Sequence, residues 1–139
     1  MRLALTIIGA ALLAGCAHDG VHPDTATAPP SLANTDWTIA SINGAAPAAQ
    51  RKAELRFTAD RISGNAGCNS FGGGYTVADG TLTATQLIST KMACIGPGMD
   101  QETAVFKILG QPMTIARQSD GSITLTDNAG ALTLTPAER

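Results

Sequence analysis

The sequence predicts a mainly β (α+β) domain, a small antiparallel meander of about eight strands curled into a barrel-like sheet, with one helix near residues 98–110. Three observations predict this fold class. Short stretches of alternating apolar and polar residues recur at regular spacing from Asp36 to Thr135. Turn signals such as Asn-Gly and Asp-Gly separate these stretches. Glycine is abundant, with 15 residues among 139, and aromatic residues are scarce, which suits thin strands better than long helices.

The N-terminal residues indicate export. Leu3–Leu13 is an apolar run in which Thr6 is the sole polar side chain. It is far shorter than the ~20 residues of a membrane-spanning helix, so residues 1–15 are predicted to be a signal peptide. The tetrad Leu13-Ala14-Gly15-Cys16 resembles the lipobox of bacterial lipoproteins. This resemblance implies that Cys16 begins the mature chain and carries acyl chains, palmitate among them, that hold the protein on a membrane.

The segment after Cys16 is predicted to be a flexible tether. Residues 16–34 are rich in Pro, Ala, Thr and Asp and contain few apolar anchors. Both histidines, His18 and His22, lie in it without a partner ligand nearby, so they predict no metal site. Ala17 rather than Asp follows the cysteine. By resemblance to lipoprotein sorting in Gram-negative bacteria, this favours the outer membrane, and we expect the domain to face the periplasm.

The folded domain is expected over residues 35–136. Strands are predicted at 36–42, 53–58, 61–64, 75–77, 82–88, 113–116, 122–126 and 131–135. The second strand shows the pattern most clearly, because Leu55 and Phe57 point inward while Glu54 and Arg56 point outward. Turns are predicted at 43–44, 59–60, 79–80, 120–121 and 128–130, each of which contains Asn, Asp or Gly.

One segment, Pro97 to Gly110, has helical rather than alternating spacing. Phe106 and Leu109 recur with Met99, Val105 or Ile108 beside them. Acidic residues at positions 100 and 102 lie early, where the helix dipole favours negative charge, and glycine ends the helix. Because an antiparallel sheet must close or cover its edges, we expect this helix to plug one end of the barrel or cover a gap in it.

The stretch from Gly64 to Cys94 carries a resemblance to a known family. It opens G-N-A-G-C-N-S-F-G-G-G-Y and closes S-T-K-M-A-C, with Glu102, Phe106 and Leu109 downstream. This pattern resembles the META domain, also called HslJ-like, and the resemblance extends from about residue 32 to residue 136. It implies a small barrel-like fold with one helix in bacterial envelope proteins. Members are associated with heat shock, antibiotic tolerance or motility, and the family has no accepted enzymatic activity.

The chain contains three cysteines. If Cys16 is lipidated, Cys68 and Cys94 remain as a pair, and the oxidising envelope predicts a disulfide between them. The competing interpretation is a soft-metal site in which Met92 and Met99 join these cysteines around Cu(I). Methionine more often fills gaps in a core, so we predict neither a metal nor any other cofactor.

No catalytic constellation stands out. The predicted domain contains no histidine to activate a cysteine or serine nucleophile. Lys91 lies near Ser70, Ser89 and Thr90 in the sequence but does not form the S-x-x-K pattern. The glycines lack the G-K-[S/T] ending of a phosphate-binding loop. We interpret them instead as a bulge or sharp bend at a barrel corner, and we expect a protein that is not an enzyme.

The formal net charge of −2 gives no electrostatic reason to bind nucleic acid. We expect a monomeric, non-enzymatic envelope lipoprotein that binds an envelope protein partner or maintains the envelope under stress. Asn69, Ser70 and Lys91 form the candidate ligand or partner surface. The alternative is a protein-inhibitor module of the lysozyme-inhibitor type, and a Ser/Lys or Cys hydrolase is a more remote one.

Overall fold

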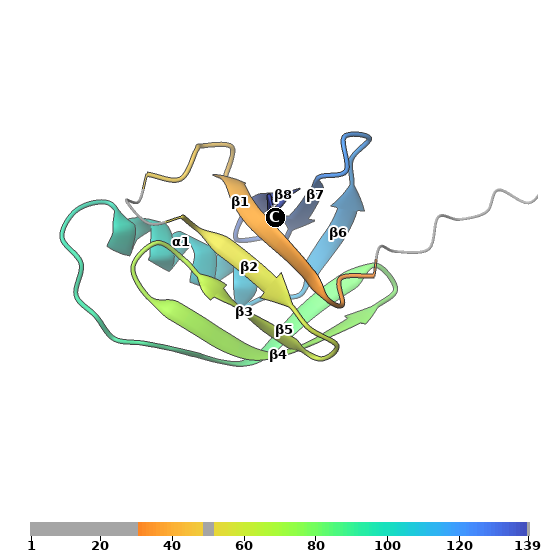
Figure 1. Ribbon diagram of the computed structural model, residues 1–139, viewed down its shortest axis with the longest axis horizontal. Helices are drawn as coiled ribbons and strands as arrows, with labels where there is room; N and C mark the ends of the chain where they lie inside the picture. The colour runs from red at the N-terminus through yellow and green to blue at the C-terminus, as the bar shows by residue number, and fades with distance from the viewer. Residues whose placement is uncertain (1–30, 49–51, 139) are drawn as a thin grey trace, which may run out of the picture.

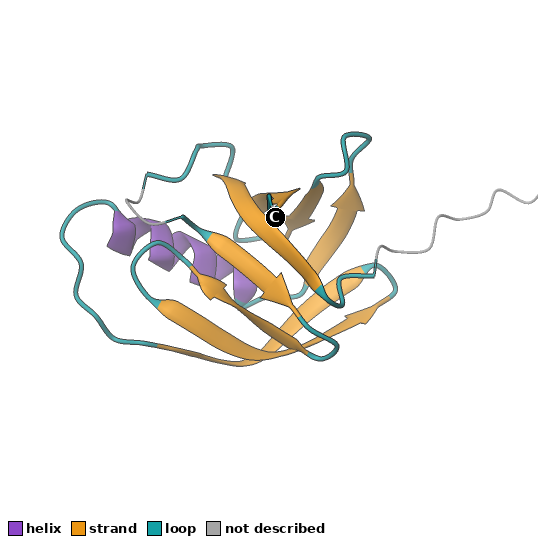
Figure 2. Cartoon of the chain, viewed as in Figure 1, coloured by secondary structure: helices purple, strands orange, loops and turns teal. Residues whose placement is uncertain are grey.

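A computed structural model describes residues 31–48 and 52–138, so the predicted signal peptide, Cys16 and most of the predicted tether lie outside the described residues. Eight antiparallel strands follow one another around a closed barrel, and β8 pairs with β1 to complete it (Figure 1). The strands are β1 (Thr35–Ile42), β2 (Glu54–Phe57), β3 (Arg61–Asn65), β4 (Ser70–Ala78), β5 (Thr81–Ser89), β6 (Met113–Arg117), β7 (Ile123–Thr126) and β8 (Ala131–Pro136). One helix, α1 (Gly98–Leu109), lies between β5 and β6 in the sequence (Figure 2). The predicted fold class is confirmed.

The alternating pattern of the sequence builds the core of the barrel. On β1, Trp37 and Ile39 are buried, and on β2 Leu55 and Phe57 are buried, as predicted. Trp37 is the register partner of Leu55, so inward residues of neighbouring strands fall at the same level of the barrel. The fully buried side chains on the remaining elements include Ile62, Leu82, Ile108, Leu109, Met113, Ile123, Leu125, Leu132 and Leu134.

Strand β4 is longer than the sequence predicts. The expected strand covers only residues 75–77, because glycine weakens strands. In the structure β4 begins at Ser70 and includes all three glycines at 72–74. Gly73 fits because β5 approaches closely here: a Cβ at this position would lie 2.5 Å from the carbonyl oxygen of Thr85.

The predicted bulge is present, but its extra residue belongs to β5. Gly72 pairs with Ile88 and Gly74 pairs with Thr85, which leaves residues 86 and 87 opposite Gly73. Gln86 adopts a positive φ of 51°, a conformation that non-glycine residues rarely take. The bend therefore depends on two strands, with glycines on one side and the bulged residue on the other.

A tight hairpin connects β4 and β5 at the predicted Asp79-Gly80 turn. β4 ends at Ala78 and β5 begins at Thr81, so the loop contains two residues. Both have positive φ, 50° for Asp79 and 73° for Gly80. This is the backbone of a type I′ turn, whose twist matches the strands that it joins.

The helix α1 packs its apolar face on the interior of the barrel and lies near β1 and β8. Val105, Ile108 and Leu109 are buried, and Phe106 packs edge-on against Phe71 with 5.3 Å between ring centroids. Met99, expected among the apolar positions of this helix, is partly exposed instead. Among the described residues, no helix is both long and apolar enough to cross a membrane.

The end of the predicted tether is part of the folded domain. Leu32 is buried, with 2% of its surface exposed, and belongs to the hydrophobic core. Packing therefore begins before the predicted boundary at residue 35. The sequence composition of residues 31–34 conceals this, because a single leucine among Ser, Ala and Asn residues is a weak apolar signal.

Candidate functional site

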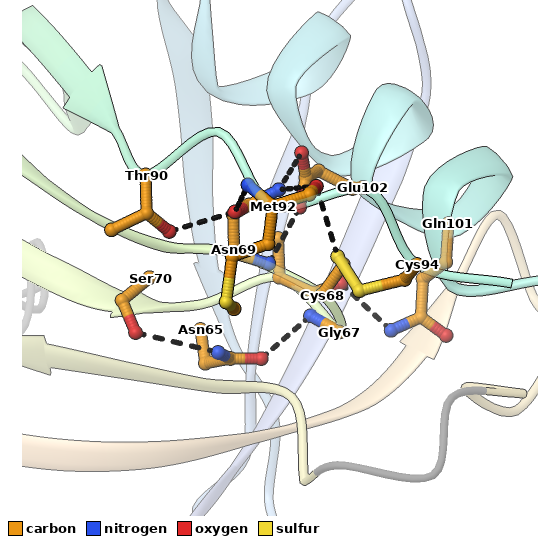
Figure 3. Close-up of a disulfide and its surroundings, with 11 residues drawn as sticks. Asn65, Gly67, Cys68, Asn69, Ser70, Thr90, Met92, Cys94, Gln101 and Glu102 are labelled. Carbon is orange, nitrogen blue, oxygen red and sulfur yellow. Dashed lines mark hydrogen bonds between the residues drawn. A yellow bond between two sulfur atoms is a disulfide. The ribbon is translucent and has the colours of Figure 1, made fainter.

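A disulfide joins two loops at one end of the barrel (Figure 3). Cys68 lies between β3 and β4, Cys94 lies in the loop from β5 to α1, and their Cα atoms are 6.0 Å apart. The predicted disulfide is thus present in the structure. Closing a loop with a sequence separation of 26 stabilises the fold by about 3–4 kcal/mol in the chain-entropy model. We call residues 64–70 and 90–94 together the disulfide corner.

Asn69 is the central polar residue of the disulfide corner. Only 2% of its surface is exposed. Its Nδ2 donates to the carbonyl oxygen of Met92 at 3.1 Å and to Oε1 of Glu102 at 3.0 Å. Its Oδ1 accepts from the Met92 backbone N–H and from the Thr90 hydroxyl, each at 2.7 Å. The amide thereby makes all four of its hydrogen bonds inside the protein, so Asn69 positions the corner and is not available to a surface ligand.

Glu102 completes this network from α1. Its carboxylate is buried, with 8% of the residue exposed, and accepts from the Asn69 backbone N–H at 2.8 Å as well as from the Asn69 side chain. Next to it, Gln101 donates to the carbonyl oxygen of Ala66 at 2.8 Å and accepts from the backbone N–H of Ala48 at 2.8 Å. Two neighbouring polar side chains of the helix thus hold loops that are distant in the sequence.

The sequence interpretation missed the role of these two helix residues. It assigned Glu102 to the helix dipole, whereas the side chain turns inward to the corner (Figure 3). A signal was present: positions 101 and 102 lie on the same helical face as Val105, Ile108 and Leu109, which are buried. Polar residues on the apolar face of a helix indicate a buried polar contact.

The other two residues of the predicted partner surface, Ser70 and Lys91, are both exposed. Ser70 begins β4, and its carbonyl oxygen accepts from the Thr90 N–H at 3.0 Å. Lys91 follows Thr90 in the loop that the corner holds. The disulfide corner therefore brings the two side chains onto neighbouring segments of one framework.

Ser70 also lines a surface groove of about 840 Å³. The groove includes small and polar residues of β3 and β4, among them Ser63, Gly64 and Asn65. An exposed ion pair between Arg56 and Asp36, 2.6 Å apart, lies at this groove. Asp36 raises the pKa of Arg56 through a hydrogen bond and through its charge. A pair exposed to solvent on both sides contributes little to stability.

The geometry does not support the two chemical alternatives considered from sequence. The disulfide uses both thiols of the proposed soft-metal site, so Met92 and Met99 have no thiolate beside them. Among residues 31–48 and 52–138, no group of three or more His, Cys, Asp or Glu side chains could hold a metal ion. Thr90 donates its hydroxyl to Asn69, and no hydrogen bond of the described residues links Lys91 to a hydroxyl.

Comparisons with known proteins agree with this architecture. The family model of the META domain matches residues 30–139. No curated protein matches the chain. A protein from Burkholderia xenovorans, solved by NMR, is similar with 25% sequence identity and a TM-score of 0.62, over 85% of this chain and 98% of that one. A second NMR structure shares the fold, with 24% identity and a TM-score of 0.65, over 74% of this chain and 89% of the other.

Proposed function

The chain belongs to the META domain family, and from this membership we propose that it is a non-enzymatic binding module of the bacterial envelope, tethered to the outer membrane through acyl chains on Cys16. Its role is to bind an envelope partner and so to maintain the envelope under stress. The observation that carries the proposal is the disulfide corner, whose interior bonds leave the side chains of Ser70 and Lys91 exposed on a rigid framework.

Rigidity favours binding because a surface that is already ordered loses little conformational entropy when a partner docks. At the corner, the Met92 backbone is held on both sides, by its N–H and its carbonyl oxygen, to one buried amide. The neighbouring Cys94 is fixed by the disulfide. The loop that carries Lys91 is thus preorganised.

Two features support the envelope setting. The disulfide suits an oxidising compartment. The lipobox-like tetrad ending at Cys16 precedes the first described residue, Ser31, by 15 positions, a length that spans at most ~50 Å when extended. A domain on such a tether stays near the membrane surface.

Labelling with palmitate tests the anchor. We expect the full chain, expressed in a Gram-negative host, to incorporate labelled palmitate and to sediment with the outer-membrane fraction. The Cys16→Ser variant is the matched control and should lose both the label and the membrane association. Retention of label by that variant contradicts anchoring through Cys16.

Site-specific crosslinking tests the binding role. A photoreactive amino acid replaces Ser70 in the anchored chain, and the exposed Thr126 on β7 serves as the control position. We expect one reproducible adduct in stressed cells from position 70 and none from position 126. Absence of any adduct from the corner and from the rest of the described surface contradicts a protein-binding role.

The loop from β5 to α1 favours a second candidate function, inhibition of an envelope-directed lysozyme. Inhibitors present a rigid, exposed loop to an enzyme's cleft, and residues 91–93 are exposed while Cys94 is fixed by the disulfide. Lysozyme activity measured with and without the purified full chain tests this candidate. Unchanged lysis at a large molar excess of the chain rules it out.

A further inference from the structure

The exposed apolar side chains of this domain gather in one segment. Five large hydrophobic side chains are exposed among the described residues, and four of them lie between Ile88 and Met99. Ile95 is fully exposed, Ile88 is 73% exposed and Met92 is 46% exposed. The fifth, Val77, lines a depression together with Ser31 and Leu32, where the described chain begins. We call residues 88–99 the apolar loop.

The apolar loop is held in this exposed state by the protein itself. Both backbone groups of Met92 bond to Asn69, and Cys94 is joined to the fully buried Cys68. A loop without such constraints could fold its isoleucine and methionines back onto the barrel. Apolar side chains that a fixed backbone keeps in water do not gain the free energy of burial. This free energy becomes available to binding when a partner covers them.

The apolar loop continues from a strand whose outer edge is unpaired. Pairing between β5 and β6 is limited to Thr81 with Thr114 and Leu82 with Met113. From Thr83 to Ser89, no described strand pairs with this edge, and β5 contains no charged side chain. Natural proteins often protect such edges with charges, and an uncharged edge accepts an added strand. The bulge at Gln86 divides the edge, so residues 87–89 form the end of β5 that runs into the apolar loop.

From these observations we infer that the apolar loop and the adjoining edge of β5 bind an extended, apolar segment of a partner protein. Main-chain groups of the segment pair with the edge of β5, and its side chains cover Ile88, Met92 and Ile95. This inference rests on the proposed function, because it takes the chain to be a tethered binding module.

Location and charge favour a protein over a lipid surface as the occupant. The loop from β5 to α1 lies on the left of Figures 1 and 2, whereas the described chain begins on the right. The described chain thus begins on the side of the domain opposite the apolar loop (Figure 1), so its attachment point does not hold the loop against a bilayer. Lys91 is exposed within the loop, but Asp100 is exposed directly after it, and Lys107 lies in the last turn of α1, so no basic cluster attracts anionic headgroups. A bilayer also offers no partner for the free edge of β5.

Crosslinking in cells identifies the partner to be used as the probe. A photoreactive amino acid replaces Ile95 in the anchored full chain, and Val77, the exposed apolar residue near the start of the described chain, is the matched control position. We expect a discrete protein adduct from position 95 and none from position 77. The captured protein, identified by mass spectrometry and purified, then serves as the binding probe.

Binding of this probe to the full chain in the Cys16→Ser background is the decisive measurement. We expect Ile88→Lys combined with Ile95→Asp to weaken binding at least about tenfold, while Val77→Asp changes it less than about twofold. Amide exchange of residues 87–89 should slow in the complex if a strand adds there. Because all three replaced side chains are exposed, we expect each variant to fold. Circular dichroism checks that it does.

Two outcomes overturn the inference. The first is binding of the Cys16→Ser chain to phosphatidylethanolamine–phosphatidylglycerol vesicles that Ile95→Asp abolishes, because it identifies a lipid occupant. The second is a crosslinked adduct from position 70 without one from position 95. That result is compatible with the proposed function but shows that the apolar loop and the edge of β5 are not the binding surface. Absence of an adduct from every position tested, or retention of the palmitate label by the Cys16→Ser variant, contradicts the proposed function itself.

Discussion

At the scale of single residues, Asn69 joins three parts of the chain that are far apart in the sequence. It follows the disulfide cysteine, accepts from the Thr90 hydroxyl and the Met92 N–H, and donates to Glu102 on α1. Every donor and acceptor of its buried side chain is used, so no other residue type can make the same four hydrogen bonds in this space. The amide is therefore a structural requirement of the corner.

Substitution of Asn69 should destabilise the domain strongly. Asn69→Ala leaves part of the Glu102 carboxylate and both backbone groups of Met92 without partners, so we expect the free energy of unfolding to fall by about 2–4 kcal/mol. Urea unfolding followed by circular dichroism measures this loss. Ser70→Ala, on the exposed neighbouring residue, should change stability by less than about 0.5 kcal/mol.

Asn69→Asp separates hydrogen bonding from shape. It preserves the size of the side chain but removes the Nδ2 donors and places a second carboxylate beside Glu102. We expect it to be at least as unstable as Asn69→Ala. A stable aspartate variant would show that the corner requires only the volume of this side chain.

Tyr75 gives a pH dependence that spectroscopy can isolate, because it is the sole tyrosine of the chain. Burial raises the pKa of its phenol above the ordinary value of 10.0, and the charge of Asp60 adds to the increase. The hydroxyl donates to the carbonyl oxygen of Thr58 at 2.8 Å, a bond that only the neutral phenol makes. Its ring also packs edge-on against Phe57, with 5.1 Å between centroids.

We expect the tyrosine of the folded chain to titrate above pH 10, and that of the urea-unfolded chain near pH 10. Since the folded-state pKa is the higher one, the stabilisation is fully present below the unfolded pKa. It is lost as the pH rises through the folded pKa. Ultraviolet absorbance of tyrosinate follows both titrations, and Tyr75→Phe should remove this part of the alkaline instability. Equal pKa values in both states would contradict the burial argument.

At the scale of elements, strand β4 requires glycine at Gly73, where β5 approaches closely, and tolerates a side chain at the preceding Gly72, which faces β3. A Cβ on Gly73 would lie 2.5 Å from the Thr85 carbonyl oxygen and 2.9 Å from Cδ2 of Leu87. A Cβ on Gly72 would meet its nearest atom at 3.6 Å, which is ordinary van der Waals contact. The two glycines are neighbours in one strand, so they form a matched pair.

Gly73→Ala should therefore destabilise the domain by roughly 2–3 kcal/mol, because the backbone of β5 must move to admit the methyl group. Gly72→Ala should change stability by less than about 1 kcal/mol, and its reduced freedom in the unfolded chain favours the folded state. Thermal and urea unfolding of the two variants provide the comparison. Equal destabilisation by both substitutions would contradict the close approach at Gly73.

These elements also show how far the sequence predicts the structure. Alternation places β1, β2, β7 and β8 correctly, because half-buried strands must present apolar residues at every second position. It fails for the first half of β4, where the glycines serve a close approach of β5, a strand that follows later in the chain. Local propensity contains no information about such a contact. The interior role of Glu102 escaped prediction for the same reason, since its partner Asn69 lies 33 positions away.

At the scale of the whole molecule, closure of the barrel is uneven. β4 and β5 pair over seven residue pairs, whereas β5 and β6 pair over two. The chain between these last two strands contains the apolar loop and α1. The disulfide ties this connection to the β3–β4 corner, so it braces the barrel beside its weakest seam.

Loss of the disulfide should therefore lower stability and loosen one region selectively. In the Cys16→Ser background, we expect Cys68→Ser combined with Cys94→Ser to reduce the free energy of unfolding by about 3–4 kcal/mol. The variant should remain folded, because a domain of this size is ordinarily stable by about 5–15 kcal/mol. Thiol titration of the denatured, unreduced Cys16→Ser chain should detect no free thiol.

Amide exchange locates the effect of removing the bond. We expect residues 90–98 and the first turn of α1 to exchange faster in the double-serine variant, because the bond and the buried network at Asn69 hold that connection. Ile39 on β1 and Leu134 on β8, which are paired far from the weak seam, should keep their protection relative to global stability. Uniform acceleration around the whole barrel would instead mean that the disulfide acts on the unfolded chain alone and does not brace the seam between β5 and β6.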